Sequence, residues 1–367
     1  MTDWVQKALE IAPKLAAQAD EHDANDTFVT ENYALLRERR FFSALVPADL
    51  GGGGASPAEM CEVLRILAYH CPSTALAFSM HVHNGLTLRW RHLHGQPTTA
   101  LLKRIAAEEL VLVTSGGSDW LNSSGVATKV EGGFRVKGRK VFASGSPGGS
   151  LFLTSAVHED PAAGPTVLMF GVPFGAQGIK VLDNWRTHGM RGTGSNDVVL
   201  EDLFVADGAV AGKRPKGELV PIFFVIAQNF VPASYSAYFG AAEAARDIAV
   251  KAATAKRADV ATQILAGELD TELEAARLVL RAVVDRLDSI EATPEGMNRV
   301  MMARVLLARS FQRIGEKAME TAGGGSYFRS SPLERYVRDL RASMFHPLQE
   351  KPQAIFAGRL ALGLPPA

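Results

Sequence analysis

Hydroxyl and glycine residues gather in one short run in the middle of the chain, residues 113–119. Thr114, Ser115 and Ser118 supply hydroxyl groups there, and the glycines between them leave backbone N–H groups exposed. Hydroxyls and amides can hydrogen-bond the polar edge of a flat ligand. The run is therefore the first candidate for a binding site.

A second candidate lies where an aromatic ring and a hydroxyl are two residues apart, at Phe142 and Ser144. Side chains two residues apart on a strand point to the same face. We therefore expect Phe142 to pack beside a ligand and Ser144 to give that ligand one hydrogen bond.

Metal and disulfide chemistry have weaker support. His81 and His83 are two residues apart in a helical segment, so they point to different faces, and no third ligand is evident. Cys61 and Cys71 have no neighbouring Cys-x-x-Cys pattern, which favours two reduced core thiols. We expect no metal site and interpret the two histidines as core or pocket lining.

The composition excludes several classes of function. The chain has 367 residues, enough for two or three packed units, and its 39 basic and 39 acidic side chains give no net field for nucleic acid or an acidic membrane. The N-terminus lacks the apolar core of a signal peptide, and no segment approaches the roughly 18 apolar residues of a membrane helix. We expect a cytoplasmic enzyme that binds neither nucleic acid nor membrane.

Helical periodicity dominates the first part of the chain. Apolar residues recur at helical spacing over residues 4–44, which predicts a helix pair ending at the glycine loop 51–54. Ser56 before Pro57 predicts the start of another helix, and Pro72 predicts its end.

The composition changes at Leu110, after which Val, Phe and Thr are frequent to about Gly212. A glycine turn at residues 131–133 between two β-like runs predicts a hairpin. Residues 151–157 and 166–172 have the apolar runs of buried strands. We therefore expect one antiparallel β domain here.

Helical periodicity returns after the basic linker that begins at Lys213. One stripe alternates steps of four and three residues, as in a helix of an antiparallel bundle: Leu269, Leu273, Ala276, Leu280, Val283 and Leu287. Similar patterns cover residues 221–254 and 298–321. We expect an α+β protein with an N-terminal helical domain over 1–109, a middle antiparallel β-barrel or sandwich over 110–212, and a C-terminal antiparallel four-helix bundle over 213–367.

This order of domains and several local motifs resemble the acyl-CoA dehydrogenase superfamily over nearly the whole chain. The motifs are the passage 42–52 with its Gly-Gly end, the Gly-Ser-Asp run at 117–119, the strand 140–145, the segments 190–195 and 200–205, the glycines 323–325 and Tyr336-Val-Arg-Asp-Leu-Arg341. Each motif is weak alone, but their order along the chain is specific.

The resemblance implies the acyl-CoA dehydrogenase fold and a flavin cofactor, FAD or FMN. By similarity, the flavin-facing residues are Thr114, Ser115, Ser118, Phe142 and Ser144. The family also places an arginine after the first long bundle helix, where it reaches the flavin pyrophosphate of a partner subunit. Arg257 stands there without the usual Arg-x-x-Phe-Gly, and Gly323 and Gly324 match another cofactor motif. The resemblance further implies a homo-oligomer, a dimer or tetramer.

The sequence departs from the family at the catalytic base. Acyl-CoA dehydrogenases use a Glu carboxylate to remove the α-proton of a thioester. At the two family positions for that base this chain has the turn at His346 and the aromatic Phe230, and neither is a carboxylate. The departure resembles the reduced-flavin-dependent monooxygenases of the same fold, several of which carry a His in this turn. That resemblance implies that His346 is catalytic with a pKa near neutrality. The aromatic side chains of Phe230, Tyr235 and Tyr238 indicate either the lining of a substrate pocket for a ring or acyl tail, or core packing.

Three functions stay open at this point. The missing Glu favours oxygenation of a small organic substrate with reduced flavin from a separate flavin reductase. An acyl-CoA dehydrogenase with a relocated base, for which Glu350 is the candidate, would instead pass electrons to an electron-transfer flavoprotein. A catalytically inactive binding or scaffold protein would keep the fold and bind no flavin.

Overall fold

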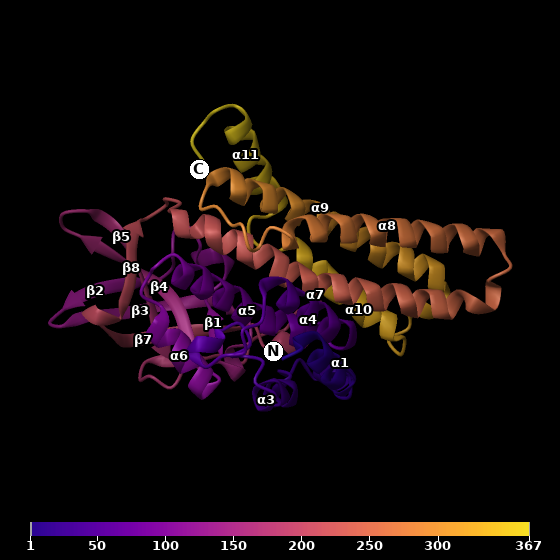
Figure 1. The fold of residues 1–367 in the computed structure, drawn as a ribbon, viewed down its shortest axis with the longest axis horizontal. Helices are drawn as coiled ribbons and strands as arrows, with labels where there is room; N and C mark the ends of the chain where they lie inside the picture. The colour runs from indigo at the N-terminus through magenta and orange to yellow at the C-terminus, as the bar shows by residue number, and fades with distance from the viewer. Residues whose placement is uncertain (1, 367) are drawn as a thin grey trace.

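The computed structural model describes residues 2–366, except for the side chain of Ser118. Figure 1 shows a sheet at one end, a long helical bundle at the other and the N-terminal helices packed along both. This arrangement is the expected order of a helical region, a β region and a second helical region.

The N-terminal helices are α1 (Trp4–Leu15), α2 (Ala19–Asn25), α3 (Thr30–Glu38), α4 (Pro57–His70), α5 (Pro72–Leu93) and α6 (Thr99–Glu108). Ser56 caps α4 in a capping box with Glu59, and Pro72 begins α5, so both predicted boundaries are confirmed. The predicted helix pair over residues 4–44 is wrong, because Asp26 adopts the left-handed conformation that ends α2 and leaves three short helices.

The strands are β1 (Leu112–Thr114), β2 (Val126–Val130), β3 (Gly133–Ala143), β4 (Leu151–Asp160), β5 (Gly164–Pro173), β6 (Ile179–Val181), β7 (Asn196–Ala206) and β8 (Val210–Pro215). They form one sheet in the order β6-β7-β3-β2-β4-β5-β8, with β1 beside β4. All pairs are antiparallel except β1 with β4 and a single position of β2 with β4. The predicted hairpin is β2–β3, and residues 151–157 and 166–172 lie in β4 and β5.

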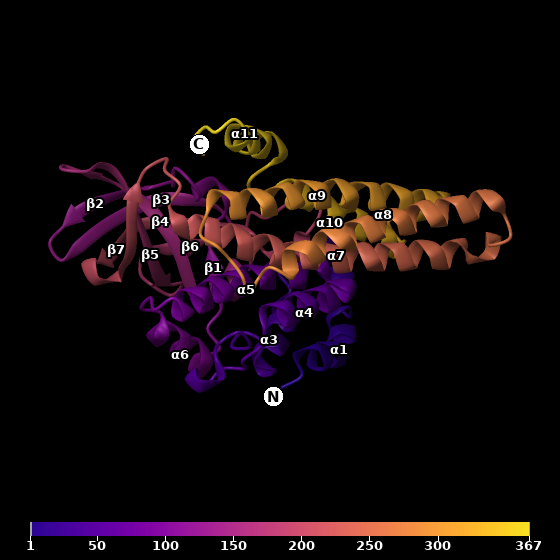
Figure 2. The same cartoon turned by 45° about the horizontal axis from the view of Figure 1, so that its top comes forward.

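The C-terminal helices are α7 (Pro221–Ala253), α8 (Val260–Val284), α9 (Pro294–Ala322), α10 (Pro332–Arg341) and α11 (Glu350–Ala361). Every residue of the predicted stripe from Leu269 to Leu287 is buried. Figures 1 and 2 both show α7, α8 and α9 as parallel rods, with the α7–α8 connection at the tip farthest from the sheet. Among the described residues, no helix is long and apolar enough to cross a membrane.

Two apolar cores connect the three regions. One core joins the N-terminal helices to the sheet and includes Phe78, Val136 and Phe152. The other fills the bundle and also takes in Met190, from the loop before β7, and Leu76 of α5. Because Met190 is buried in the bundle core, the β region is fixed against the helices that follow it.

Candidate active site

The loop after β1 and the end of β3 lie side by side. The backbone N–H of Gly116 donates to the carbonyl oxygen of Phe142 at 3.1 Å, which joins the two predicted ligand-binding segments. Thr114 ends β1 and stays partly exposed, whereas the hydroxyl oxygen of Ser115 lies 2.8 Å from that of Thr154 on β4. The two segments therefore form one wall of a site, in which the Ser115 hydroxyl is already used on the sheet. The side chain of Ser118 is outside the part of the chain that the structure describes.

Phe142 and Ser144 share the open face of β3 and its end. Phe142 keeps 37% of its surface exposed, and its ring leans on Trp185 with the ring centroids 4.9 Å apart. Ala143 between them is buried, while Phe142 is exposed and Ser144 is partly exposed, at the point where the register of β3 against β7 shifts. The hydroxyl of Ser144 accepts a hydrogen bond from Ser195 at 2.8 Å. The sheet thus presents an exposed ring beside a hydroxyl.

A buried ion pair fastens the 117–119 turn to β3. The ammonium nitrogen of Lys140 lies 2.8 Å from a carboxylate oxygen of Asp119, and the two side chains are 0% and 5% exposed. Lys140 also donates to the carbonyl oxygens of Ser124 and Ser155. Burial lowers the pKa of Lys140, and the Asp119 charge opposes that shift. Sequence reasoning missed this pair, although Asp119 belongs to the Gly-Ser-Asp motif.

The loop meets the C-terminal bundle closely at Gly117, and Trp120 of the same loop packs against Phe223 of α7. A Cβ on Gly117 would lie 2.8 Å from Cγ of Pro347, so only glycine fits against that ring. Pro347 directly follows His346, the predicted catalytic residue. The structure therefore brings the β1–β2 loop and the His346 turn together, although they are far apart in the sequence.

Aromatic side chains of α7 surround His346. The hydroxyl oxygen of Tyr238 is 2.7 Å from Nε2, and the ring centroids of Phe230 and Tyr235 are 5.4 and 6.2 Å from that of the imidazole. The three residues predicted to line a pocket thus cluster around the predicted catalytic residue. The hydroxyl of Tyr235 donates to the carbonyl oxygen of Ser343 at 2.7 Å, so this side chain supports the His346 turn.

Arg304 of α9 holds the same turn from inside the bundle. Its side chain is almost fully buried, with 1% exposure, and one guanidinium nitrogen donates to the carbonyl oxygens of Ser343, Met344 and His346. No carboxylate among the described residues forms an ion pair with Arg304. A buried cation that is stabilised only by carbonyl dipoles leaves its positive field on the neighbouring imidazole.

The protonation state of His346 differs from the expectation of a near-neutral pKa. Burial, the charge of Arg304 and that of His83 lower the pKa of His346 to about 3, so the ring is neutral at pH 7. Burial raises the pKa of Tyr238 well above its ordinary value, and its hydroxyl has no other acceptor among the described residues. We therefore assign Tyr238 as the donor to Nε2. The neutral His346 ring then carries its own proton on Nδ1.

His83 is a buried residue beside the His346 cluster, with neighbours that the sequence did not reveal. Its ring packs edge-on against Phe230 with centroids 5.4 Å apart, and Nδ1 donates to the carbonyl oxygen of Ser79. Burial lowers the pKa of His83 to about 4. His81 faces the core instead, accepting from the Leu112 amide and donating to the Phe42 carbonyl. The His-x-His spacing was the available signal, and it separates one side chain beside the His346 cluster from one core side chain.

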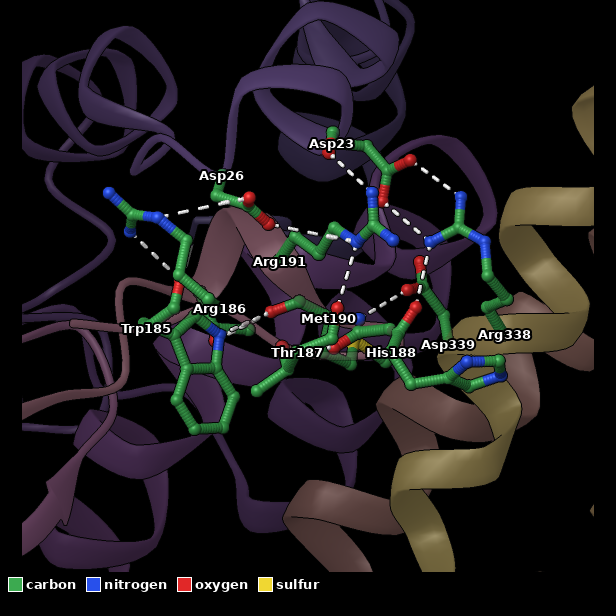
Figure 3. Close-up of polar contacts among 12 residues, drawn as sticks. Asp23, Asp26, Trp185, Arg186, Thr187, His188, Met190, Arg191, Arg338 and Asp339 are labelled. Atoms are coloured by element: carbon green, nitrogen blue, oxygen red, sulfur yellow. Dashed lines mark hydrogen bonds and ion pairs between the residues drawn. The ribbon is translucent and has the colours of Figure 1, made fainter. Parts of the chain in front are cut away.

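The loop from Trp185 to Arg191 connects these parts, as Figure 3 shows. The indole nitrogen of Trp185 donates to the carbonyl oxygen of Met190 at 3.0 Å, and the amide of Met190 donates to the buried carboxylate of Asp339 on α10. Arg191 donates to the carbonyl oxygen of Thr187 and lies 3.7 Å from a carboxylate oxygen of Asp26, so this side chain is engaged within the loop and its neighbour. The wall beside Phe142 is therefore tied to the helix that leads to His346.

Three predicted cofactor residues lie away from this cluster in the same chain. Arg257 is exposed in the α7–α8 connection, at the tip seen in Figure 1. Gly323 ends α9 with a positive φ of 77°, and Gly324 follows it at the surface. A role for these residues at a flavin needs a second subunit and stays a prediction.

Glu350, the candidate for a relocated base, is engaged elsewhere. Its carboxylate pairs with the exposed Arg309, and this hydrogen bond lowers its pKa. The groups whose electrostatic effect lowers the pKa of His346 are Arg304 and His83, and no carboxylate is among them. The turn therefore offers a neutral imidazole where a dehydrogenase needs a basic carboxylate.

Two surface hollows lie outside the His346 cluster. One, of about 540 Å³, is bordered by charged side chains that pair with one another, among them Arg65 with Glu243 and Arg246 with Asp270. The other, of about 500 Å³, borders Trp185 on the sheet. Among the described residues, no group of three or more His, Cys, Asp or Glu could hold a metal ion.

Comparison with known families gives three matches that follow one another along the chain. Residues 5–109 match the acyl-CoA dehydrogenase N-terminal domain, residues 114–203 the middle domain and residues 234–350 a C-terminal domain of that family. The β1–β2 loop, the end of β3 and the His346 turn all fall inside these ranges.

Individual relatives are moderately similar. L-evernosamine nitrososynthase from a Micromonospora species is 29% identical over 358 residues, covering 91% of this chain and 84% of that protein. Isobutylamine N-hydroxylase from Streptomyces viridifaciens is 28% identical, covering 93% and 89%. A solved structure of KijD3 in complex with FMN and a dTDP-amino-sugar superposes with a TM-score of 0.89 at 27% identity, covering 100% of this chain and 95% of that one.

Proposed function

The chain belongs to the acyl-CoA dehydrogenase family, and we propose that within it the protein is a flavin-dependent monooxygenase acting on a small organic substrate. One observation carries the proposal. The turn that would hold the base of a dehydrogenase holds the neutral His346, bonded to Tyr238, with Arg304 behind it. Such a turn is poor at removing a carbon-bound proton and well suited to hydrogen-bonding a neutral oxygen or nitrogen atom.

The residues on the sheet side fit a flavin. Phe142 presents an exposed ring, Ser144 a hydroxyl on the same face, and Thr114 a hydroxyl at the edge of the neighbouring loop. Glycines at 116 and 117 let that loop approach Phe142 and Pro347 closely. We propose that Thr114, Ser118, Phe142 and Ser144 hold FMN or FAD, with Ser115 supporting the loop. When bound, reduced flavin supplies the electrons that activate oxygen for transfer of one oxygen atom.

His346 then acts on the substrate side. With Nε2 accepting from Tyr238, its Nδ1–H is left to donate a hydrogen bond across the site. Arg304 fixes the turn and disfavours a second proton on the ring. We propose that His346 orients the reacting group as a neutral donor and that Phe230 and His83 shape the pocket.

The pocket chemistry favours a substrate that enters uncharged. The groups around His346 are aromatic rings, neutral imidazoles and a buried guanidinium, so an ammonium ion would find no counter-charge there. The relatives include an N-hydroxylase of an amine and a nitrososynthase. We propose an amine, bound as its free base, as the first substrate class to test.

We further propose that the protein takes reduced flavin from a separate reductase and works as a homo-oligomer. Apolar side chains of α8 and α9 remain exposed in the single chain, among them Ile264, Leu278, Met302 and Leu306. A second copy covering this face would also give Arg257, Gly323 and Gly324 a place near a partner's cofactor.

The test compares three reactions of the purified full chain. With reduced FMN or FAD, oxygen and a panel of amines, we expect an oxygenated product by mass spectrometry. Bleaching of the oxidised-flavin spectrum by acyl-CoA without oxygen would establish the dehydrogenase instead. A protein that binds neither FMN nor FAD, in either redox state, would be the scaffold that keeps only the fold.

A further inference from the structure

A short row of hydroxyl groups runs from the loop before β7 to the end of β3. The hydroxyl oxygen of Thr193 is 2.7 Å from that of Ser195, and Ser195 donates to Ser144 at 2.8 Å. Thr193 and Ser195 are 0% and 2% exposed, while Ser144 keeps part of its surface open. The row therefore begins in the interior and ends at the proposed flavin face.

Counting protons along the row leaves one proton unused. Each hydroxyl carries one proton and can accept two hydrogen bonds. The arrangement that gives every contact within the row one proton has Thr193 donating to Ser195 and Ser195 donating to Ser144. In this arrangement the proton of Ser144 has no acceptor among the described residues. Ser144 is therefore left as a donor towards the open face.

The inner end of the row is anchored to the bundle. The carbonyl oxygen of Met190 accepts from the indole of Trp185 and lies 2.8 Å from the Thr193 hydroxyl oxygen, while the Met190 amide donates to Asp339, as Figure 3 shows for Trp185 and Asp339. Met190 has a positive φ of 54°, which lets its amide and carbonyl serve two different elements. Asp339 is buried in the last turn of α10, where the helix dipole disfavours an anion, and the charge of Arg335 and the Met190 amide both stabilise its carboxylate.

We propose that Ser195 is a positioning residue that, from the interior, fixes Ser144 as a hydrogen-bond donor to an acceptor atom of the bound flavin. The inference rests on the proposed function, because it takes Ser144 as a flavin-facing residue. Ser195 itself is buried behind Ser144 and acts only through it. A donor held in this way favours the oxidised flavin, whose central ring nitrogen accepts a hydrogen bond.

The test is a double-mutant cycle on binding of oxidised FMN and FAD, followed by their visible absorption spectra. One hydrogen bond corresponds to roughly a fivefold change in affinity, so Ser144→Ala should weaken binding by about that factor. Ser195→Ala should weaken binding less, and should have no further effect in the Ser144→Ala background. The Ser195→Cys variant, which keeps the volume and a weak donor, should lie between wild type and Ser195→Ala.

Ser146→Ala is the matched control, because Ser146 is an equally buried neighbour whose hydroxyl donates to the carbonyl oxygen of Gly194. It should leave the flavin spectrum unchanged. In the protein without flavin, Ser144→Ala and Ser195→Ala should each lower the unfolding midpoint. The double variant should lower it by less than the sum of the two single changes. If the wild type binds flavin and the two substitutions weaken binding additively, the inference about Ser195 is overturned and the proposed function stands. Absence of FMN and FAD binding in the wild type overturns the proposed function together with it.

Discussion

The hydroxyl oxygen of Tyr238 lies 2.7 Å from Nε2 of His346, and this contact joins a fully buried phenol of α7 to the turn after α10. Tyr238→Phe removes the donor and leaves the ring in place. We expect kcat to fall about five- to tenfold with little change in flavin affinity, because a neutral hydrogen bond contributes about 1 kcal/mol. Steady-state oxygenation with a supply of reduced flavin measures this. Tyr327→Phe, at an exposed position, is the control, and equal rates for both variants would contradict the role of Tyr238.

Arg304 should control the protonation of His346. Arg304→Gln keeps amide donors near the turn and removes the charge, so the pKa of His346 should rise above about 3 while burial still holds it below its ordinary value. Arg304→Lys should keep that pKa low. An NMR titration of the His346 ring follows the shift without any cofactor. Arg309→Gln, on the exposed side of the same helix, should have no effect, and a pKa of His346 unchanged in Arg304→Gln would refute the assignment.

The pair of Lys140 and Asp119 should contribute strongly to stability. Lys140→Met leaves the Asp119 carboxylate buried without its partner, which costs about 3–5 kcal/mol of unfolding free energy. Replacing Asp119 by Asn in the same chain should recover part of that loss. The control is Lys129→Met, which breaks an exposed pair with Asp207 and should cost about 0–1 kcal/mol. Urea unfolding of each variant measures the unfolding free energy. Similar losses of unfolding free energy in Lys140→Met and Lys129→Met would argue against a strong contribution from the buried pair.

Acid should destabilise the protein through its buried histidines. The folded-state pKa values of His81 and His83 are about 4 and that of His346 about 3, below the unfolded value near 6.5. Between these limits the unfolded chain binds more protons, so the unfolding free energy should fall as the pH drops from about 6.5 towards 4. Asp339 acts in the opposite direction, because its raised pKa of about 6 makes the folded chain the better proton binder between 3.8 and 6. Urea midpoints at pH 7 and pH 4.5 measure the combined effect of these four groups on stability. Because three histidines oppose one aspartate, the midpoint should be lower at pH 4.5.

His83→Gln gives a direct check of that titration. Glutamine can still donate to the Ser79 carbonyl, but it does not titrate. The difference between the two urea midpoints should therefore shrink in this variant. A difference as large as in the wild type would show that His83 titrates normally in the folded protein.

Local signals in the sequence predicted much of the fold. Ser56 with Pro57 marked a helix start, and the steps from Leu269 to Leu287 marked a buried helix face, because capping and periodicity act within a few residues. The break at Asp26 was missed, since a single left-handed residue carries little signal without Gly or Pro.

The site was predicted only in part, because its decisive relations are between distant residues. Arg304 looks like an ordinary surface arginine in an amphipathic helix, and only the packing of the His346 turn shows that it is buried. Lys140 likewise stands in a strand where alternation alone does not reveal its pairing with Asp119. The low pKa of His346 follows from its burial and from the charge of Arg304, so no local pattern could give it.

The contact between Gly117 and Pro347 also bears on how such an enzyme could change over time. At this contact the main chain of the loop lies directly against one proline ring, so any side chain at position 117 would push the two segments apart. Substitutions on α5 and α7 around His346 can proceed while this contact is kept. Selection or laboratory evolution for new compounds should accumulate changes around Phe230 and His83 and spare this glycine.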